Sequence, residues 1–430
     1  MHHETMTSRE RVYKAIRRQP VDRMPIDLGC HFSTGISVVA YWNLCKFLGY
    51  DISNIEMVDC VQCLARVEDI VAERFHIDTV LLNPPWADPW RWTMRAPYTF
   101  TVPDTFRPQL RADGAWVMTV GGANGGGDRL DGNSGDDGSG GGDGGGSGNS
   151  GGGGDGKSDA NGGGAHLGDA NGHASHLMMP AGGFFFDGSW PSFSNLRHSD
   201  NMRLYAERAK RLYEETDRFT MYMGFGAYFD GLDFACDMLT DPDKCKAQNE
   251  EALRSSIEHY DDVNRMFGRY IGAVVVNSDL GMQTGPMCSP ASYEEVCYPY
   301  LKRFCDHVHA TSDLKVFLHS CGSVAKLLPL IVDAGVDILN PVQISAADMD
   351  AGALKAAFGD KLTFWGGGCD TQRVLWASPP DEIVAHVRGQ IAALKPGSGF
   401  VFNMVHNIMG NVPPENVVAM LDTAYEESWY

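Results

Sequence analysis

The sequence has no long apolar run and few basic residues. No stretch approaches the roughly 18 apolar residues that cross a bilayer, so we expect no membrane span. Lys and Arg number 35 against 55 Asp and Glu, which gives a net charge of −20 at pH 7. This acidity argues against nucleic acid as the main partner, because phosphate binding needs basic patches. The first residues, Met1 to Glu4, also lack the charged-then-apolar pattern of a signal peptide, and we expect a cytoplasmic protein.

The sequence also lacks the signs of a disulfide framework and of a dinucleotide-binding sheet. Its 11 cysteines are odd in number and scattered along the chain, which favours free thiols in a reducing compartment. No Gly-x-Gly-x-x-Gly motif follows the first strand of the predicted strand–helix series. A doubly wound nucleotide-binding fold therefore has little support.

Glycine, by contrast, is abundant, and about half of its 50 residues lie between positions 122 and 176 together with Asp, Ser and Asn. Such a segment has almost no side chains that can pack, so it cannot bury enough apolar surface to offset its ordering entropy. We predict that residues 122–176 form a long disordered Gly-rich insertion. When the insertion is left out, the remainder of the chain 1–430 has the length of one large domain.

Short apolar runs alternate with helical patterns in the remainder of the chain. We expect a helix over Ser53–Phe75 and antiparallel strands in the aromatic-rich stretch from Trp86 to Val120. A strand followed by a helix then recurs five or more times, which is typical of parallel βα units. The number of units and the length fit a (β/α)8 TIM barrel. The predicted strands of this series are Phe219–Met223, Ala273–Asn277, Lys315–Leu318, Asp337–Asn340, Leu362–Trp365 and Gly399–Asn403.

Polar and metal-binding side chains follow nearly every one of these strands. Barrel active sites lie at the carboxyl ends of the strands, so these residues are candidates as a set. His319 and Cys321 are two residues apart and can face one point, and their nitrogen and sulfur are zinc ligands. Asp, Asn and Gly often end strands only as turn formers, and buried Cys often only packs. The other strand-end residues are Asn277, Asp279, Gln283, Asn340, Gln343, Cys369, Asp370, Asn403, His406 and Asn407.

Longer motifs around these residues carry a family resemblance. The most specific are Asp279–Pro286, Leu318–Gly322, Asp337–Gln343, Phe364–Gln372 and Phe402–Ile408. With them the chain resembles the uroporphyrinogen decarboxylase-like superfamily, and most closely its zinc-dependent, corrinoid-linked methyltransferase branch. The resemblance extends over nearly everything from position 185 to the end and over the N-terminal segments 6–12 and 22–25, but not over the insertion. It implies a (β/α)8 barrel.

The resemblance also implies a zinc site and its surroundings. In the methyltransferase branch, zinc is held by a His-x-Cys pair and by a Cys after the last barrel strand. His319 and Cys321 match the pair, whereas His406 stands at the place of the third ligand. Cys369, one strand earlier, is a third or fourth candidate ligand or a packed thiol. The implied catalytic residues are Asp279, Gln283 and Asp370, and the implied substrate-binding residues are Asn340, Gln343 and Asn403.

Three functions are compatible with these residues. The resemblance implies a methyltransferase that moves a methyl group between a small methylated substrate or acceptor (thiol, folate, ether or amine) and a corrinoid, or cobalamin, carried on a separate corrinoid-binding protein. The alternative is a metal-free decarboxylase or lyase that uses Asp279 and Asp370 for acid–base chemistry. True uroporphyrinogen decarboxylases carry an arginine-rich substrate motif near the start, and the corresponding stretch Pro25–Phe32 has no arginine. A non-catalytic binding protein is the third possibility, although the converging polar groups weigh against it.

Overall fold

The computed structural model describes residues 3–86, 88–120, 175–188 and 199–430. The predicted insertion, residues 122–176, lies outside the described residues except for its last two, which begin strand β7. The helices are α1 (Ser8–Ile16), α2 (Val38–Leu48), α3 (Asp69–Arg74), α4 (Ser199–Glu215), α5 (Gly231–Thr240), α6 (Pro242–Phe267), α7 (Pro290–Val296), α8 (Tyr298–Thr311), α9 (Leu328–Asp333), α10 (Ala351–Phe358), α11 (Pro380–Leu394) and α12 (Pro414–Glu426). The barrel strands are β9 (Met221–Gly226), β10 (Ala273–Asn277), β13 (Lys315–His319), β14 (Ile338–Asn340), β15 (Thr363–Trp365) and β16 (Phe400–Val401).

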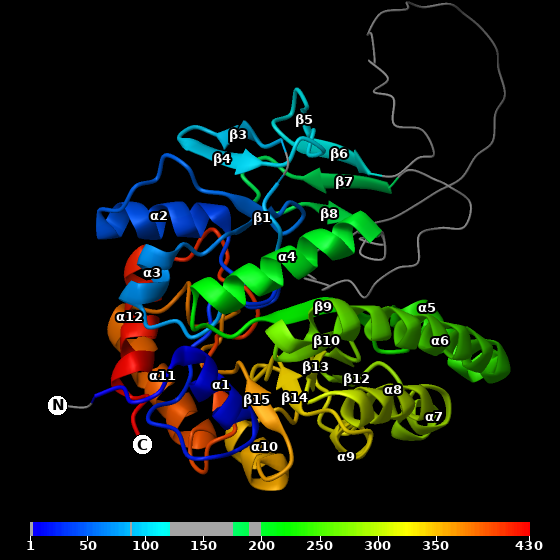
Figure 1. Ribbon diagram of the computed structural model, residues 1–430. Helices are drawn as coiled ribbons and strands as arrows, with labels where there is room; N and C mark the ends of the chain where they lie inside the picture. The colour runs from blue at the N-terminus through cyan, green and yellow to red at the C-terminus, as the bar shows by residue number, and fades with distance from the viewer. Residues whose placement is uncertain (1–2, 87, 121–174, 189–198) are drawn as a thin grey trace, which may run out of the picture.

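These six strands form one parallel sheet in the order β16, β15, β14, β13, β10 and β9 (Figure 1). Two extended segments close it into a barrel. Residues 24–28 run parallel to β16, with a bridge from Ile26 to Phe402. Residues 77–81 run parallel to β9 and meet the first segment where the Asp78 amide donates to the Ile26 carbonyl at 2.8 Å. The predicted (β/α)8 barrel is confirmed, and irregular segments supply the two strands that the sheet lacks.

The alternation of side chains along each strand decides which of them face the barrel interior. Val275 and Phe317 are fully buried in one interior cluster with residues of the other strands, whereas Val274 and Val276 pack outward against the helices. Side chains two residues apart on a strand share a face. The interior face therefore continues, at the carboxyl end, into Asn277, His319, Asn340 and Asn403.

A buried ion cluster holds the second closing segment in place. Asp78 accepts hydrogen bonds from Arg11 Nη1 at 2.6 Å and from Arg23 Nη1 at 2.7 Å, and all three side chains are at most 1% exposed. Buried charges are tolerated only when they are paired in this way. The cluster ties α1 and the first closing segment to residues 77–81, and so stabilises the part of the barrel that lacks regular strands.

The predicted helix over Ser53–Phe75 is wrong except for its last part, α3. Strands β1 (Met57–Asp59) and β2 (Leu64–Ala65) pair antiparallel there. Asp59 Oδ1 accepts from two amides of the intervening turn, at 2.8 and 3.0 Å, and Cys63 has a φ of 53°. A side chain that accepts hydrogen bonds from the amides of its own turn competes with helical hydrogen bonding. Here the turn capped by Asp59 forms in place of the helix that the apolar pattern predicts.

Small antiparallel sheets lie beside the barrel (Figure 1). One pairs β3 (Trp90–Arg95) with β4 (Tyr98–Val102), and the other contains β5 (Gln109–Leu110), β6 (Trp116–Val120), β7 (Ser175–Met179) and β8 (Asp187–Gly188). The hairpin β11 (Gly281–Met282) and β12 (Gly285–Pro286) follows β10. The antiparallel strands expected between Trp86 and Val120 are confirmed. In the described part of the chain, no helix has the length and apolarity needed to cross a membrane.

Candidate metal centre

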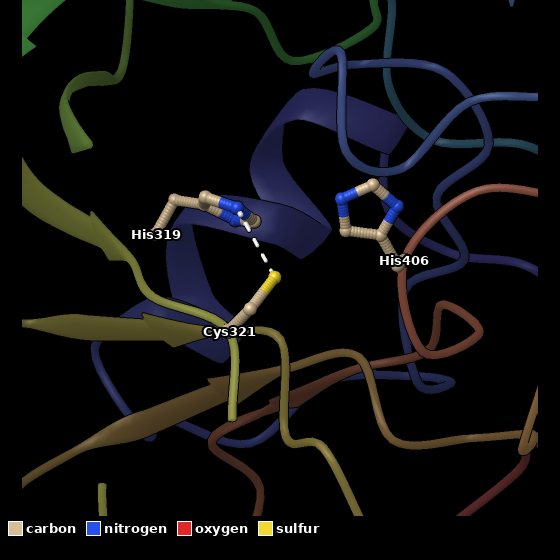
Figure 2. Close-up of side chains that lie close together, drawn as sticks. All are labelled: His319, Cys321 and His406. Atoms are coloured by element: carbon tan, nitrogen blue, oxygen red, sulfur yellow. Dashed lines mark hydrogen bonds between the residues drawn. The ribbon is translucent and has the colours of Figure 1, made fainter. Parts of the chain in front are cut away.

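Three metal-binding side chains meet at the carboxyl end of the barrel (Figure 2). His319 ends β13, Cys321 follows two residues later, and His406 lies on the loop after β16. One donor atom of each lies within 4.8 Å of the others, and His319 Nε2 is 3.7 Å from Cys321 Sγ. Figure 2 shows the side chains pointing toward one another, with His406 approaching from a different loop.

A neighbouring amide fixes the position of the proton on His319. Asn340 Nδ2 donates to the Trp365 carbonyl at 2.9 Å, so its Oδ1 is the atom that faces His319 Nδ1, at 2.8 Å. Since Oδ1 can only accept, Nδ1 carries the ring proton and Nε2 keeps a lone pair directed at Cys321. Ser33 Oγ lies 2.9 Å from the same Nδ1. Asn340 thus prepares His319 to bind a metal through Nε2.

The turn after β13 holds Cys321. Its amide donates to Asp279 Oδ1 at 2.8 Å, and the next amide, that of Gly322, donates to Gln343 Oε1 at 2.6 Å. Gly322 has a φ of 82°, and a Cβ at this position would lie 2.2 Å from the carbonyl carbon of Gly281. Only glycine fits such a close approach. The turn therefore places the Cys321 sulfur beside His319.

His406 occupies an unusual backbone position. Its φ of 61° lies in the left-handed region, which is uncommon for a residue other than glycine. Contacts on both sides hold the loop: the Val405 amide donates to the Cys369 carbonyl at 2.8 Å, and Asn407 Oδ1 accepts from the Gly35 amide at 2.7 Å. Strain that is held by its surroundings is concentrated at functional sites.

Burial sets the protonation of these groups. It lowers the pKa of His406 to about 3, with a further contribution from His319, so the ring is neutral and offers a lone pair. Burial, together with the nearby Asp279 carboxylate, raises the pKa of the Cys321 thiol well above its usual range. It also raises the pKa of Asp279, an effect that His319 opposes. A thiol in this setting is a poor nucleophile by itself but ionises when it coordinates a cation.

The donor set fits Zn²⁺. Zinc binds His nitrogen at about 2.0–2.1 Å and Cys sulfur at about 2.3 Å, so two such ligands at a tetrahedral angle lie about 3.6 Å apart. The distance between His319 Nε2 and Cys321 Sγ is 3.7 Å. Structural zinc sites use four protein ligands, whereas catalytic sites use three and keep one position open. Three protein donors, two nitrogens and one sulfur, are the number expected of a catalytic site.

Cys369 and Asp370 lie next to this group without joining it. Cys369 is fully buried, and burial raises the pKa of its thiol. It contributes its carbonyl to the loop that carries His406, while its sulfur lies outside the cluster of donors. Asp370 Oδ1 accepts from the amides of Gln372 and Arg373 and so caps the turn that follows it.

The predicted polar residues fall into two groups. Asn340 and Gln343 contact the His319 ring and the Cys321 turn, as described above. Asn403 is fully buried, and its Nδ2 donates to the Asp27 carbonyl at 3.0 Å. Gln283, in contrast, lies exposed on the β11–β12 hairpin, and its Nε2 donates to the Gln372 side chain at 3.0 Å.

The sequence patterns missed the contribution of the loop at residues 29–37. Ser33 contacts the His319 ring, and the ring of His31 lies with its centroid 5.3 Å from that of His319. Ser33 and His319 are 286 positions apart, so no local motif connects them. The loop follows the segment 24–28, and treating that segment as a barrel strand would have brought these residues into the strand-end set.

Comparisons with known proteins agree with this architecture. Residues 226–427 match the family model for uroporphyrinogen decarboxylase (URO-D). The solved structure of a methyltransferase from Methanosarcina mazei aligns with 98% of this chain and 99% of its own, with a TM-score of 0.53 and 15% sequence identity, a likeness of fold. Residues 226–427, a little under half of the chain, are therefore similar in sequence to the uroporphyrinogen decarboxylase family.

Curated proteins that are similar to part of the chain carry the name uroporphyrinogen decarboxylase. The protein from Aromatoleum aromaticum is 28% identical over 153 residues, which is 34% of this chain and 39% of the relative. That from Azoarcus sp. is 36% identical over 80 residues, or 19% and 22% of the two chains. The match spans about two fifths or less of these relatives. A match over part of the chain leaves the reaction to be inferred from the site.

Proposed function

We propose that the chain is a zinc-dependent methyltransferase. It would move a methyl group between a small methylated substrate or acceptor (thiol, folate, ether or amine) and a corrinoid carried on a separate protein. The observation that carries this proposal is the convergence of His319, Cys321 and His406, with donor atoms within 4.8 Å of one another and a lone pair fixed on His319 Nε2. The whole-chain fold likeness to a methyltransferase is in keeping with it.

Zinc held by these three residues would supply Lewis acidity, either to keep a bound thiol as the thiolate or to polarise an ether or amine that carries the methyl group. The residues of the chain orient the site. Asn340 keeps His319 in the tautomer that presents Nε2. Asp279 holds the Cys321 amide and lies 4.0 Å from His319 Nε2, close enough to orient a group bound in the open position.

Methyl transfer to free cob(I)alamin tests the proposal. The protein is incubated with cob(I)alamin and, in turn, a thioether, an aryl methyl ether and a methylamine, and methylcobalamin formation is followed by its absorption spectrum. We expect transfer from one class of donor with the zinc-loaded protein and at least a 100-fold lower rate with His319→Ala. Transfer that proceeds equally well after removal of zinc would contradict the proposal.

A metal-free decarboxylase is the second candidate, and Asp279 is the observation that favours it. Burial raises the pKa of this carboxyl group, as suits a general acid, and the curated relatives carry the name of a decarboxylase. The stretch Pro25–Phe32 nevertheless lacks arginines that would bind substrate carboxylates. This candidate predicts activity that survives exhaustive chelation and is lost in Asp279→Asn.

We also propose that residues 1–430 form one barrel domain, interrupted by the insertion at 122–176, and that it works in the cytoplasm beside its corrinoid-binding partner. All 11 cysteines are free, as suits a reducing compartment. Size-exclusion chromatography with a corrinoid-loaded partner protein tests the association. We expect the two proteins to elute together, and a partner that lacks its corrinoid domain to elute separately. Separate elution of the corrinoid-loaded partner would contradict the proposed association.

A further inference from the structure

Two basic side chains meet at the amino-terminal end of the barrel, opposite the candidate metal centre. Helix α1 covers this end (Figure 1): its Ile16 side chain packs in the interior cluster, and the Thr363 hydroxyl at the start of β15 donates to the Ile16 carbonyl at 3.0 Å. Arg18 comes just after α1, and Lys355 lies on α10. Both side chains approach Gly399, the residue before β16. The pair therefore lies where the barrel strands begin.

Gly399 leaves room for both side chains. It has a φ of 71°, and a Cβ at this position would lie 2.9 Å from Arg18 Cγ and 3.6 Å from Lys355 Nζ. Lys355 Nζ donates to the Ser398 carbonyl, and Arg18 Nη1 donates to the Ile16 carbonyl at 3.4 Å. An ammonium has three N–H donors and a guanidinium has five. Each cation therefore keeps donors for a further acceptor.

The charges of this pair are not balanced by an acid. Neither cation forms an ion pair with a carboxylate in the described part of the chain, and both side chains are partly buried. Burial lowers the pKa of Lys355 to about 8, and the charge of Arg18 adds to the effect. Burial and a neighbouring like charge both disfavour a charged group. An anion between the two side chains would offset the repulsion and accept the remaining N–H groups.

We propose that Arg18 and Lys355 bind a phosphate group at the amino-terminal end of the barrel. The inference does not depend on the proposed function. A phosphate monoester carries a charge of about −1.5 to −2 at pH 7 and presents three acceptor oxygens, which matches two cations with unused donors. A carboxylate carries only one charge. A bound phosphate would join α1, α10 and the start of β16, and so would stabilise the last strand of the barrel.

Calorimetric titration with inorganic phosphate at constant ionic strength tests the site, with acetate as the singly charged comparison. We expect saturable binding of phosphate and weaker binding of acetate. Arg18→Gln and Lys355→Gln should each weaken phosphate at least tenfold, whereas Lys355→Arg keeps the charge and should stay within about threefold of the wild type. Lys46→Gln is the matched control, because Lys46 is an exposed lysine in the last turn of another helix, α2. It should bind phosphate as the wild type does.

Phosphate is also a ligand of zinc, so the titration is repeated with His319→Ala. Binding that persists in this variant is the expected result. Loss of binding in His319→Ala would overturn the inference, as would the absence of saturable binding by the wild type or an affinity that Arg18→Gln and Lys355→Gln leave unchanged. Failure of the zinc site would leave these outcomes unaffected, because they are read from phosphate affinity alone.

Two further measurements complete the test. Glycerol 3-phosphate distinguishes the source of the ligand: binding as tight as that of inorganic phosphate assigns the site to the phosphate group of a larger molecule, and exclusion assigns it to free phosphate. Mass spectrometry of the wild type needs no variant. Phosphate should protect Lys355 from acetylation by acetic anhydride and leave Lys46 reactive, and acetylation of Lys355 that phosphate does not slow would contradict the site.

Discussion

Replacing Asn340 by Leu isolates the hydrogen bond that prepares His319 for zinc. The side chains have similar volumes, so packing changes little, but three polar contacts disappear. His319 Nδ1 loses the acceptor at 2.8 Å that fixes its tautomer, the Trp365 carbonyl loses the donor at 2.9 Å, and the Ser33 hydroxyl loses an acceptor at 3.1 Å. Ser33 Oγ stays 2.9 Å from His319 Nδ1 and retains part of the orientation.

The size of the effect follows from what each contact does. Removing a partner that orients a metal-binding His lowers metal affinity by about 10–100-fold, which corresponds to about 1.4–2.8 kcal/mol. Leaving the Trp365 carbonyl without its donor in the interior lowers the free energy of unfolding by about 1–3 kcal/mol. Asn340→Leu should therefore weaken both zinc binding and the fold, and Ser33→Ala should weaken zinc binding less.

Competition with a chromophoric chelator measures the zinc affinity, and urea unfolding measures stability. Asn416→Leu is the matched control, because Asn416 is buried and its Nδ2 donates at 2.9 Å to the carbonyls of Leu375 and Ser378, away from the three ligands. It should lower stability by a similar amount and leave zinc affinity within about threefold. The role assigned to Asn340 would be refuted if folded Asn340→Leu bound zinc as tightly as the wild type. It would also be refuted if Asn416→Leu lost as much zinc affinity as Asn340→Leu.

Three further predictions follow from the same contacts. Cys321→Ala should abolish stoichiometric zinc binding, whereas Cys369→Ala should keep the zinc affinity within about threefold of the wild type, as equilibrium dialysis can measure. An equal loss of zinc in both variants would place Cys369 among the ligands. Burial raises the pKa of Cys321, so at a pH below that pKa zinc must displace a proton from the thiol. The zinc affinity should therefore rise about tenfold per pH unit between about pH 7 and 8.5. A zinc affinity that does not change with pH would count against a thiolate ligand. Asp78→Asn leaves the buried Arg11 and Arg23 with weaker partners, so the free energy of unfolding in urea should fall by about 3–5 kcal/mol, whereas a loss below about 1 kcal/mol would show that the cluster does not stabilise the barrel.

The barrel could be predicted because its strands carry a strong local signal. Apolar runs such as Ala273–Asn277 have the bounds that the structure gives them. Fully buried parallel strands read as continuous apolar runs, which makes them visible in sequence. The helix predicted over Ser53–Phe75 is wrong because Asp59 caps a turn, and a contact of that kind has a weak sequence signal.

The candidate site could be predicted only in part. His319 and Cys321 were found because side chains two positions apart at a strand end share a direction, and His406 because it follows the last strand. The contacts made by Asn340 and Ser33 depend on how distant segments meet in the barrel. No residue pattern along the chain reports such a meeting.

X-ray absorption at the zinc edge of the purified protein tests the central claim most directly. We predict one zinc per chain, bound by two nitrogen ligands and one sulfur ligand from the protein and by one further light atom in the open position. In His319→Ala the zinc content should fall far below one per chain. A purified protein that holds no stoichiometric zinc after reconstitution with the metal would contradict the zinc site. The same conclusion would follow if His319→Ala left the zinc content unchanged.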